Sequence, residues 1–127
     1  MHRNVMLIDD FALDRFLAEK VIEKNSFAER VTTFSSAIDG LSFLRSTDEE
    51  EQLPDVIFLD IYMPIMNGFQ FLDNFVGLPE LVQSKCKIVI LSSSSAAEDK
   101  ERIGNYPFVK DFIIKPLSAE KLDQLSL

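Results

Sequence analysis

The sequence predicts an α/β domain, a parallel sheet covered by helices on both faces. Five short apolar runs alternate along the chain with stretches of helical periodicity. Two of these runs, 56–59 and 88–91, are apolar at every position, which is typical of strands buried on both sides. Strands that alternate with helices are joined by right-handed crossovers, and such crossovers build parallel sheets. We therefore expect residues 1–127 to form one domain of this class.

The first half of the chain holds two strands and two helices. An apolar run at 5–8 gives the first strand and ends at two acidic residues. From Leu13 the apolar spacing changes to three and four residues, which predicts a helix. The core-facing stripe of this helix is expected to be Leu13, Phe16, Leu17 and Val21. A β-rich segment at 29–34 supplies the second strand, and Ser35 or Ser36 caps the helix that follows.

In the second half, the acidic stretch 48–51 is expected to form a solvated loop. The remaining strands are expected at 56–59, 88–91 and 112–114. Between them, one helix carries the apolar stripe Phe69, Leu72, Phe75 and Val76. A weak helix is predicted at 96–103, and Ser118 caps a short final helix with Leu122 and Leu125 on one face.

Composition narrows the class of protein. The 21 acidic residues exceed the 13 basic ones, a balance that disfavours direct binding to nucleic acid or to an anionic membrane. The only cysteine, Cys86, excludes an internal disulfide; it is expected to open a strand and to be structural. The first apolar run meets two acids by position nine, so it is neither a signal peptide nor a membrane span. We expect a cytoplasmic protein.

Polar residues follow four of the predicted strands. Residues just past the carboxyl ends of parallel strands converge in one crevice, and here they are Asp9, Asp10, Asp60, Ser92 and Lys115. Three carboxylates at one edge repel each other unless a cation lies between them, and Mg²⁺ prefers such oxygen ligands. Carboxylates are also nucleophiles toward phosphoryl groups. The residues predict a Mg²⁺-assisted phosphoryl site but do not decide which aspartate is the nucleophile.

A longer pattern adds to this prediction. The motif Asp60-x-x-Met-Pro-x-x-x-Gly68 stands together with Asp9-Asp10, Ser92 and Lys115-Pro116. Jointly these residues resemble the receiver domain of two-component response regulators, of the single-domain chemotaxis-regulator type, across essentially the whole chain. The resemblance implies a five-stranded sheet of flavodoxin-like order 2-1-3-4-5.

The resemblance also implies a role for each site residue. Asp60 is the expected phosphoacceptor, and Mg²⁺ is bound by Asp10, Asp60, the backbone carbonyl of Tyr62 and, through water, Asp9. Lys115, with a cis bond to Pro116, contacts the phosphoryl group, and Ser92 donates a hydrogen bond to it. Phe112 occupies the aromatic switch position, although a plain core role for this ring is equally open. The run 92–95 also leaves open a slip of the hydroxyl role by one residue.

The implied partners follow from that scheme. A sensor histidine kinase or a histidine phosphotransfer protein donates the phosphoryl group. Phosphorylation then changes the face made by 96–103, 112–114 and the final helix, which a downstream protein target reads and on which a phosphorylation-dependent homodimer is possible. We expect no enzyme activity beyond slow self-dephosphorylation, and no direct contact with nucleic acid or membrane. With no output domain after Leu125, the chain is either a stand-alone regulator or a fragment.

Three other readings compete with this one. Phosphatases with an aspartate nucleophile carry a second acid two residues later, where this chain has Tyr62. A flavodoxin-like binding protein would cradle phosphate with 92–95, but three nearby carboxylates repel a dianion. A receiver-like interaction module acting without phosphorylation is the remaining alternative.

Overall fold

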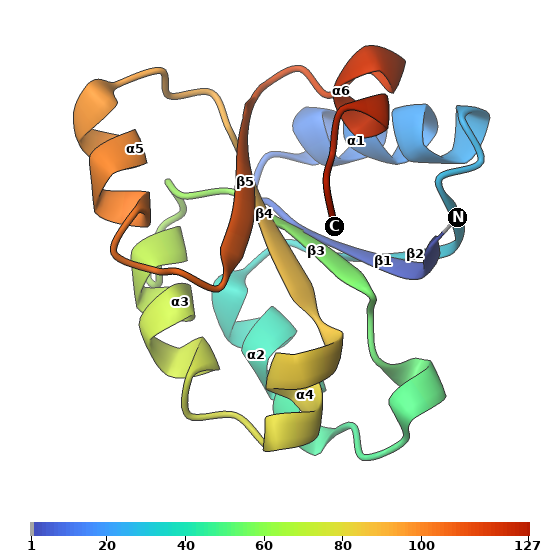
Figure 1. Ribbon diagram of the computed structural model, residues 1–127, viewed down its shortest axis with the longest axis vertical. Coiled ribbons are helices and arrows are strands. Elements are labelled where there is room, and N and C mark those ends of the chain that lie inside the picture. Colours follow the sequence, from blue (N-terminus) through green and yellow to red (C-terminus); the bar gives the residue numbers. More distant parts are fainter. Residues whose placement is uncertain (1) are drawn as a thin grey trace.

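The computed structural model describes residues 2–127, with side chains described from residue 4 onward, and Met1 of the expected domain lies outside this range. A five-stranded parallel sheet of order β2-β1-β3-β4-β5 runs through the centre (Figure 1). Its strands are β1 (His2–Ile8), β2 (Ala28–Phe34), β3 (Val56–Leu59), β4 (Lys87–Ser92) and β5 (Val109–Ile114). The expected α/β class and the 2-1-3-4-5 order are both confirmed.

Helices cover the two faces of the sheet unequally (Figure 1). One face carries α1 (Ala12–Lys24) and α6 (Ala119–Asp123). The other carries α2 (Ala37–Ser46), α3 (Gly68–Phe75), α4 (Glu80–Lys85) and α5 (Ala97–Ile103). This arrangement leaves the carboxyl ends of the strands free of helices, and the loops that follow them meet there.

The core has two parts, one on each side of the sheet, and β3 contributes to both. Ile57 and Leu59 belong to the cluster beneath α2 to α5, whereas Val56 and Phe58 belong to the cluster beneath α1 and α6. Side chains of a strand alternate between its two faces, so a strand covered on both sides must be apolar throughout. This explains the unbroken apolar run at 56–59.

The apolar stripe predicted for α1 is wrong in three of its four residues. Leu13, Phe16 and Leu17 are 57%, 55% and 47% exposed, whereas Ala18 and Ile22 form the buried face. Only Val21 of the predicted stripe packs against the core. The helix is rotated because two polar residues at its start, Asp14 and Arg15, contact the loops at the end of the sheet, as described below. Apolar spacing alone does not carry that information.

Other expectations were wrong in smaller ways. The short helix α4 was not predicted, because its six residues give too little periodicity to detect. The predicted loop at 48–51 overlaps a turn of 3₁₀ helix, Glu50–Gln52. Val76, placed in a buried stripe, ends α3 and is 54% exposed.

Cys86 and Leu125 also lie outside their expected elements. Cys86 is the C-cap of α4 rather than the first residue of a strand; it is buried, and burial raises the pKa of its thiol to about 12. That environment fits the structural role expected for it. Leu125 lies beyond the end of α6 but still packs against the cluster beneath α1 and α6. The predicted caps of α2 and α6 are correct, since the hydroxyls of Ser36 and Ser118 accept hydrogen bonds from backbone N–H groups one turn later.

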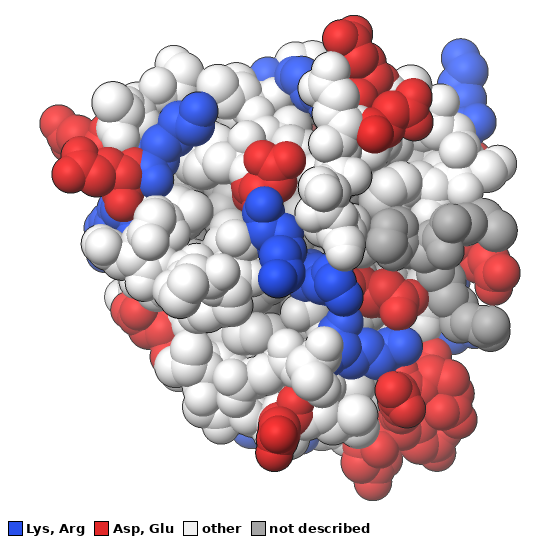
Figure 2. All heavy atoms as spheres, in the orientation of Figure 1, with Lys and Arg blue, Asp and Glu red and all other residues white. Residues whose placement is uncertain are grey.

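The surface carries charges of both signs. On the face shown in Figure 2, acidic side chains gather near the edges, and basic side chains form a line across the middle. The sequence shows no basic cluster, so this line is produced by folding. Across 2–127, no helix has the length and apolar character needed to cross a bilayer.

Candidate phosphoacceptor site

Three carboxylates meet at the carboxyl end of the sheet. Asp9 and Asp10 follow β1, and Asp60 follows β3, its N–H hydrogen-bonded to the carbonyl of Ile8 at 3.0 Å. One oxygen from each of the three carboxylates lies within 4.8 Å of the other two. Asp9 and Asp60 are buried, and Asp10 is exposed. The expected convergence is therefore observed, and this all-oxygen set is able to hold a metal ion.

The loop after β3 fixes the position of Asp60. Asn67 and Gln70 form a reciprocal capping box at the start of α3, and the N–H of Gly68 donates to the carbonyl of Ile61 at 2.7 Å. A Cβ atom at Gly68 would lie 2.7 Å from the carbonyl oxygen of Asp60 and 2.7 Å from the Cα of Ile61. Only glycine permits this approach. The glycine of the motif thus lets α3 begin directly against the backbone of Asp60.

The Asp60 carboxylate has an unusual environment. Burial raises its pKa from 3.8 to about 6; nearby Lys115 opposes the shift, and Asp9 adds to it. The nearby backbone N–H groups of Tyr62 and Ile61 also favour its charged form and so oppose the rise in pKa. A buried carboxylate of perturbed pKa in a cluster of charged groups is a mark of functional sites.

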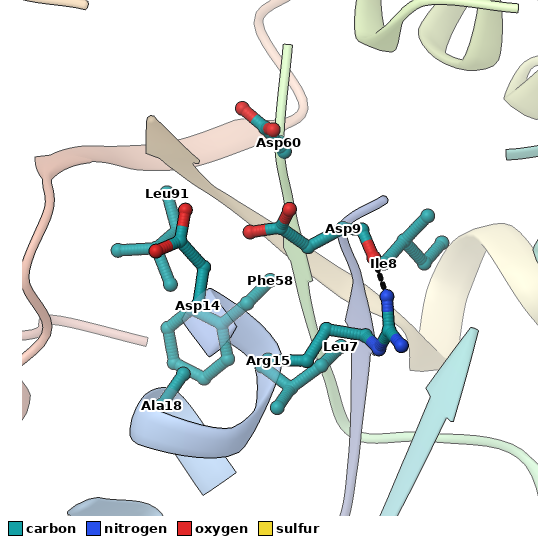
Figure 3. Close-up of a pocket in the computed structure, with 9 residues that line it drawn as sticks. All are labelled: Leu7, Ile8, Asp9, Asp14, Arg15, Ala18, Phe58, Asp60 and Leu91. Carbon is teal, nitrogen blue, oxygen red and sulfur yellow. Dashed lines mark hydrogen bonds between the residues drawn. The ribbon is translucent and has the colours of Figure 1, made fainter. Parts of the chain in front are cut away.

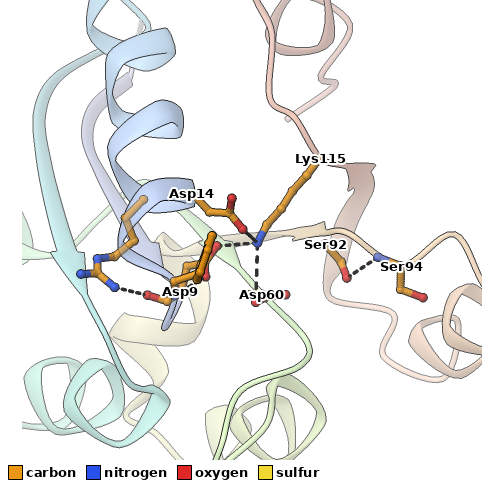
Figure 4. Close-up of polar contacts among 8 residues, drawn as sticks. Asp9, Asp14, Asp60, Ser92, Ser94 and Lys115 are labelled. Atoms are coloured by element: carbon orange, nitrogen blue, oxygen red, sulfur yellow. Dashed lines mark hydrogen bonds and ion pairs between the residues drawn. The ribbon is translucent and has the colours of Figure 1, made fainter.

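Lys115 is the cation of the cluster. Its Nζ lies 2.6 Å from Asp9 Oδ2, 2.7 Å from Asp14 Oδ2 and 3.6 Å from Asp60 Oδ2 (Figure 4). Burial alone lowers the pKa of Lys115, but the hydrogen bonds to Asp14 and Asp9 and the charge of Asp60 raise it above its ordinary value. Lys115 is therefore a fixed positive charge beside Asp60.

Asp14 was not predicted as a site residue. The apolar stripe expected for α1 would turn Asp14 toward solvent, whereas its carboxylate accepts a hydrogen bond from Lys115, 101 residues further along the chain. Neither its charge nor its position four residues after Asp10 distinguishes Asp14 from an ordinary surface aspartate of a helix. The contact becomes apparent only when the rotation of α1 is known.

Lys115 and Ser92 are held together by the backbone. The N–H of Lys115 donates to the carbonyl of Ser92 at 2.8 Å. Lys121 of α6 donates from Nζ to the carbonyls of Ile114 and Pro116, at 2.6 and 2.8 Å, on either side of Lys115. The Lys115-Pro116 bond is cis, as the sequence resemblance implied.

Ser92 is the inward hydroxyl of its serine run. It ends β4 and is 0% exposed, whereas Ser93 and Ser95 are exposed. Its Oγ accepts a hydrogen bond from the N–H of Ser94 at 3.1 Å. Ser92 is thus the only buried serine of these three, and its hydroxyl is turned toward Ser94.

The start of α1 supports Asp9 from behind. Arg15 donates from Nη1 to the carbonyl of Asp9 at 2.7 Å, and the N–H of Phe11 donates to Asp9 Oδ1 at 2.9 Å. In Figure 3 the carboxylates of Asp9, Asp14 and Asp60 border one small pocket floored by Phe58 and Leu91. The contacts from Arg15 and Phe11 thus fix both the backbone and the carboxylate of Asp9 beside Asp60.

Two expected site residues lie further out. Phe112 is half-buried on β5, packs against the cluster beneath α2 to α5, and lies under Lys100, whose Nζ is 5.9 Å from the ring centroid. The side chain of Tyr62 is exposed and points to α5, where its hydroxyl donates to Asp99. The carboxylates and Lys115 therefore lie close together, whereas the side chains of Phe112 and Tyr62 lie outside this cluster.

The chain matches the response regulator receiver domain family over residues 5–126. It is 36% identical over 112 residues to a protein-glutamate methylesterase/protein-glutamine glutaminase of Burkholderia thailandensis, covering 88% of this chain and 29% of that protein. A receiver protein from Dyadobacter fermentans has a solved structure that superposes with a TM-score of 0.84 at 32% identity, over 94% of this chain and 91% of that one. The Mn²⁺-bound form of response regulator Rcp1 gives 0.71 at 22% identity, over 94% and 86%, and shows the fold alone.

This chain belongs to the response regulator receiver domain family. Its acidic pocket, formed by Asp9, Asp10 and Asp60, is the type of site at which receiver domains accept a phosphoryl group. The chain spans less than a third of the length of the Burkholderia relative, so the methylesterase activity named for that protein is not carried over.

Proposed function

We propose that the protein is a phosphoacceptor switch in which Asp60 takes a phosphoryl group from a phosphohistidine. The donor is a sensor histidine kinase or a histidine phosphotransfer protein. The observation that carries the proposal is the buried Asp60 carboxylate, which lies 3.6 Å from Lys115 Nζ and clusters with two further carboxylates. Residues 1–127 act as one receiver unit in this scheme.

Asp10, Asp60 and the carbonyl of Tyr62 would bind Mg²⁺ directly, and Asp9 would do so through water. The donor set fits, because hard divalent ions prefer carboxylate and carbonyl oxygens. When bound, the ion neutralises negative charge that develops on the transferred group. The Mn²⁺-bound structure of Rcp1 is consistent with a divalent ion in this fold.

The transfer step uses three side chains of this protein. A carboxylate oxygen of Asp60 forms a bond to phosphorus as the P–N bond of the phosphohistidine breaks, and the electron pair of that bond stays on the imidazole nitrogen. Lys115 holds one phosphoryl oxygen as a point charge. Ser92 donates a hydrogen bond to another, which requires its hydroxyl to turn toward Asp60. Water later hydrolyses the acyl phosphate slowly, so the protein is a substrate and switch rather than an enzyme.

The exposed apolar start of α1 is the proposed contact surface for the donor. Phe11, Leu13, Phe16 and Leu17 are all exposed and lie on the same loop and helix that supply Asp9 and Asp14. A protein that brings its phosphohistidine to Asp60 must cover this edge. The output side is proposed to be the face of α5, β5 and α6 around Phe112, read by a downstream protein or a second copy of the chain. A donor of this kind is consistent with a cytoplasmic location, which we include in the proposal.

The test is the intact mass after treatment with acetyl phosphate and Mg²⁺. The wild-type protein and an Asp123→Asn control, altered at an exposed aspartate of α6, should each gain one phosphoryl group. Asp60→Asn should gain none, and chelation of the metal should abolish the gain in the wild type and in Asp123→Asn. No adduct in the wild type, with Mg²⁺ binding confirmed, would instead favour an interaction module that acts without phosphorylation.

A further inference from the structure

Asp99 joins two loops at the mouth of the site. The Tyr62 hydroxyl donates to both of its carboxylate oxygens, at 2.6 and 2.7 Å, and Ser94 Oγ donates to Oδ2 at 2.5 Å. Asp99 is only 7% exposed. Buried acids are usually paired with a cation, but among the described residues Asp99 has no Lys or Arg within 4.0 Å. Its charge is stabilised mainly by these two hydroxyls, with a smaller contribution from the charge of Arg102.

These contacts form a continuous path between the phosphoacceptor and the buried hydroxyl. Tyr62 follows Asp60 by two residues, and its nearby backbone N–H favours the charged form of the Asp60 carboxylate, while its side chain reaches Asp99. From Asp99 the path continues through the Ser94 hydroxyl, and the N–H of Ser94 donates to Ser92 Oγ at 3.1 Å. In Figure 4 the Ser92 hydroxyl is turned toward Ser94. The path thus connects Asp60 to Ser92 through one carboxylate.

Hydrogen bonding, rather than packing, determines where Tyr62 lies. Tyr62 is 57% exposed, so packing restricts its side chain little. The hydrogen bonds from Ser94 and Tyr62 hold the pKa of Asp99 below its usual range, and the bond to Asp99 raises the pKa of Tyr62. The carboxylate is therefore charged near neutral pH, and hydrogen bonds to a charged acceptor are stronger than neutral ones.

We propose that Asp99 is a positioning residue that holds Tyr62 and the turn 92–94 in the resting arrangement and opposes the turning of the Ser92 hydroxyl toward Asp60. The inference rests on the proposed function. When a phosphoryl group on Asp60 attracts the Ser92 hydroxyl, the Ser92–Ser94 hydrogen bond is lost and the hold of Asp99 on Ser94 is disturbed. The resting contacts therefore add to the free energy that switching requires.

Removal of the hydrogen bonds to Asp99 should strengthen the binding of a ligand that mimics the phosphoryl group. A ligand that binds the switched state gains affinity when the resting state loses stability. Beryllofluoride with Mg²⁺ is a suitable probe, since it occupies a phosphoryl site without a covalent transfer. Tyr62→Phe and Ser94→Ala each remove one hydroxyl from Asp99 and should tighten its apparent affinity roughly threefold to tenfold, as measured by calorimetric titration.

Two matched controls remove the same chemical groups elsewhere. Ser95→Ala alters an exposed serine of the same turn, and Tyr106→Phe removes a hydroxyl that donates to Asp73 at 2.8 Å. Both should bind beryllofluoride as the wild type does. Asp99→Asn is expected to tighten binding too, and Tyr62→Phe, altered at an exposed ring, keeps the test valid if that variant does not fold.

The outcomes separate this inference from the function on which it rests. If the wild type binds the probe and both hydroxyl-deleted variants bind it with equal or lower affinity, Asp99 has only a structural role and the inference is overturned alone. If the wild type neither binds beryllofluoride nor gains mass with acetyl phosphate, the proposed function and the inference are overturned together. Tighter binding in both variants with unchanged controls supports the inference.

Discussion

The Nζ of Lys115 lies 2.7 Å from Oδ2 of Asp14, closer than to Asp60, whose Oδ2 is 3.6 Å away. Asp14 is on α1 and Lys115 follows β5, so this ion pair joins the two ends of the chain across the site. In the resting protein, the cation proposed to hold the phosphoryl group is thus shared between Asp14 and Asp9. Its release from Asp14 becomes part of the cost of phosphorylation.

Asp14→Asn should therefore accelerate phosphorylation. The substitution removes one charged partner, leaves Lys115 bound to Asp9, and lets the ammonium move toward Asp60. We expect the rate with acetyl phosphate and Mg²⁺ to rise several-fold, about tenfold at most, the size of one charge-assisted hydrogen bond. Intact-mass time courses provide the measurement. Glu23→Gln, which removes a charge from an exposed position of the same helix, should leave the rate unchanged; an equal increase in that control would attribute the effect to net charge.

Asp60 should lower the stability of the metal-free protein at neutral pH. Because burial raises its pKa from 3.8 to about 6 in the folded state, the folded protein binds this proton more tightly than the unfolded chain. Stability from this group is thus present below about pH 4 and is lost as the pH rises to about 6. Asp60→Asn should stabilise the protein at pH 7 by about 1–2 kcal/mol, allowing for solvent screening.

Urea unfolding of the wild type and Asp60→Asn at two pH values measures this effect. The difference between the two proteins should nearly disappear at pH 4 without metal, and Mg²⁺ should reduce it at pH 7. A variant that is less stable than the wild type at pH 7 would show that the charge of Lys115 and the nearby N–H groups of Tyr62 and Ile61 outweigh the burial of the charge.

Gly68→Ala should damage both fold and site. The added Cβ would lie 2.7 Å from backbone atoms of Asp60 and Ile61, which cannot move without displacing the phosphoacceptor. We expect a loss of about 1–3 kcal/mol in the free energy of unfolding, typical of overpacking, and slower phosphorylation. Gly77→Ala is the matched control, because its nearest atom, the carbonyl of Asn74, would be 3.5 Å away. Equal losses in the two variants would mean that contact with the backbone of Asp60 is not the cause of the loss at Gly68.

The exposed face of α1 should contribute little to stability. Phe16→Ala should change the free energy of unfolding by less than about 0.5 kcal/mol, because the ring is 55% exposed. Ile22→Ala, on the buried face of the same helix, should cost about 2–5 kcal/mol. Thermal or urea unfolding distinguishes them. A large loss of stability in Phe16→Ala would mean that Phe16 is buried, as the predicted apolar stripe required.

Phosphorylation of Phe16→Ala by acetyl phosphate should remain normal, since this small donor needs no docking surface.

The sequence alone determined the class of fold and most of the site. Fully apolar runs indicate strands buried on both faces, and the topology of parallel strands requires that residues after their carboxyl ends converge. This is why Asp9, Asp10, Asp60 and Lys115 were found together as expected. Each of these residues directly follows a strand in the sequence, and the carboxyl ends of all the strands lie at the same edge of the sheet.

Tertiary structure decided which way the helices turn and which polar groups find partners. The rotation of α1 exposes Phe16 and brings Asp14 to Lys115, against the apolar spacing. Leaving a largely buried ammonium without a charged partner is less favourable than leaving the ring of Phe16 exposed. Asp99 likewise has no sequence signal, since its two partners, Tyr62 and Ser94, come from separate loops. Periodicity reports the average preference of a helix for the core, whereas such individual contacts between distant segments exist only in the folded chain.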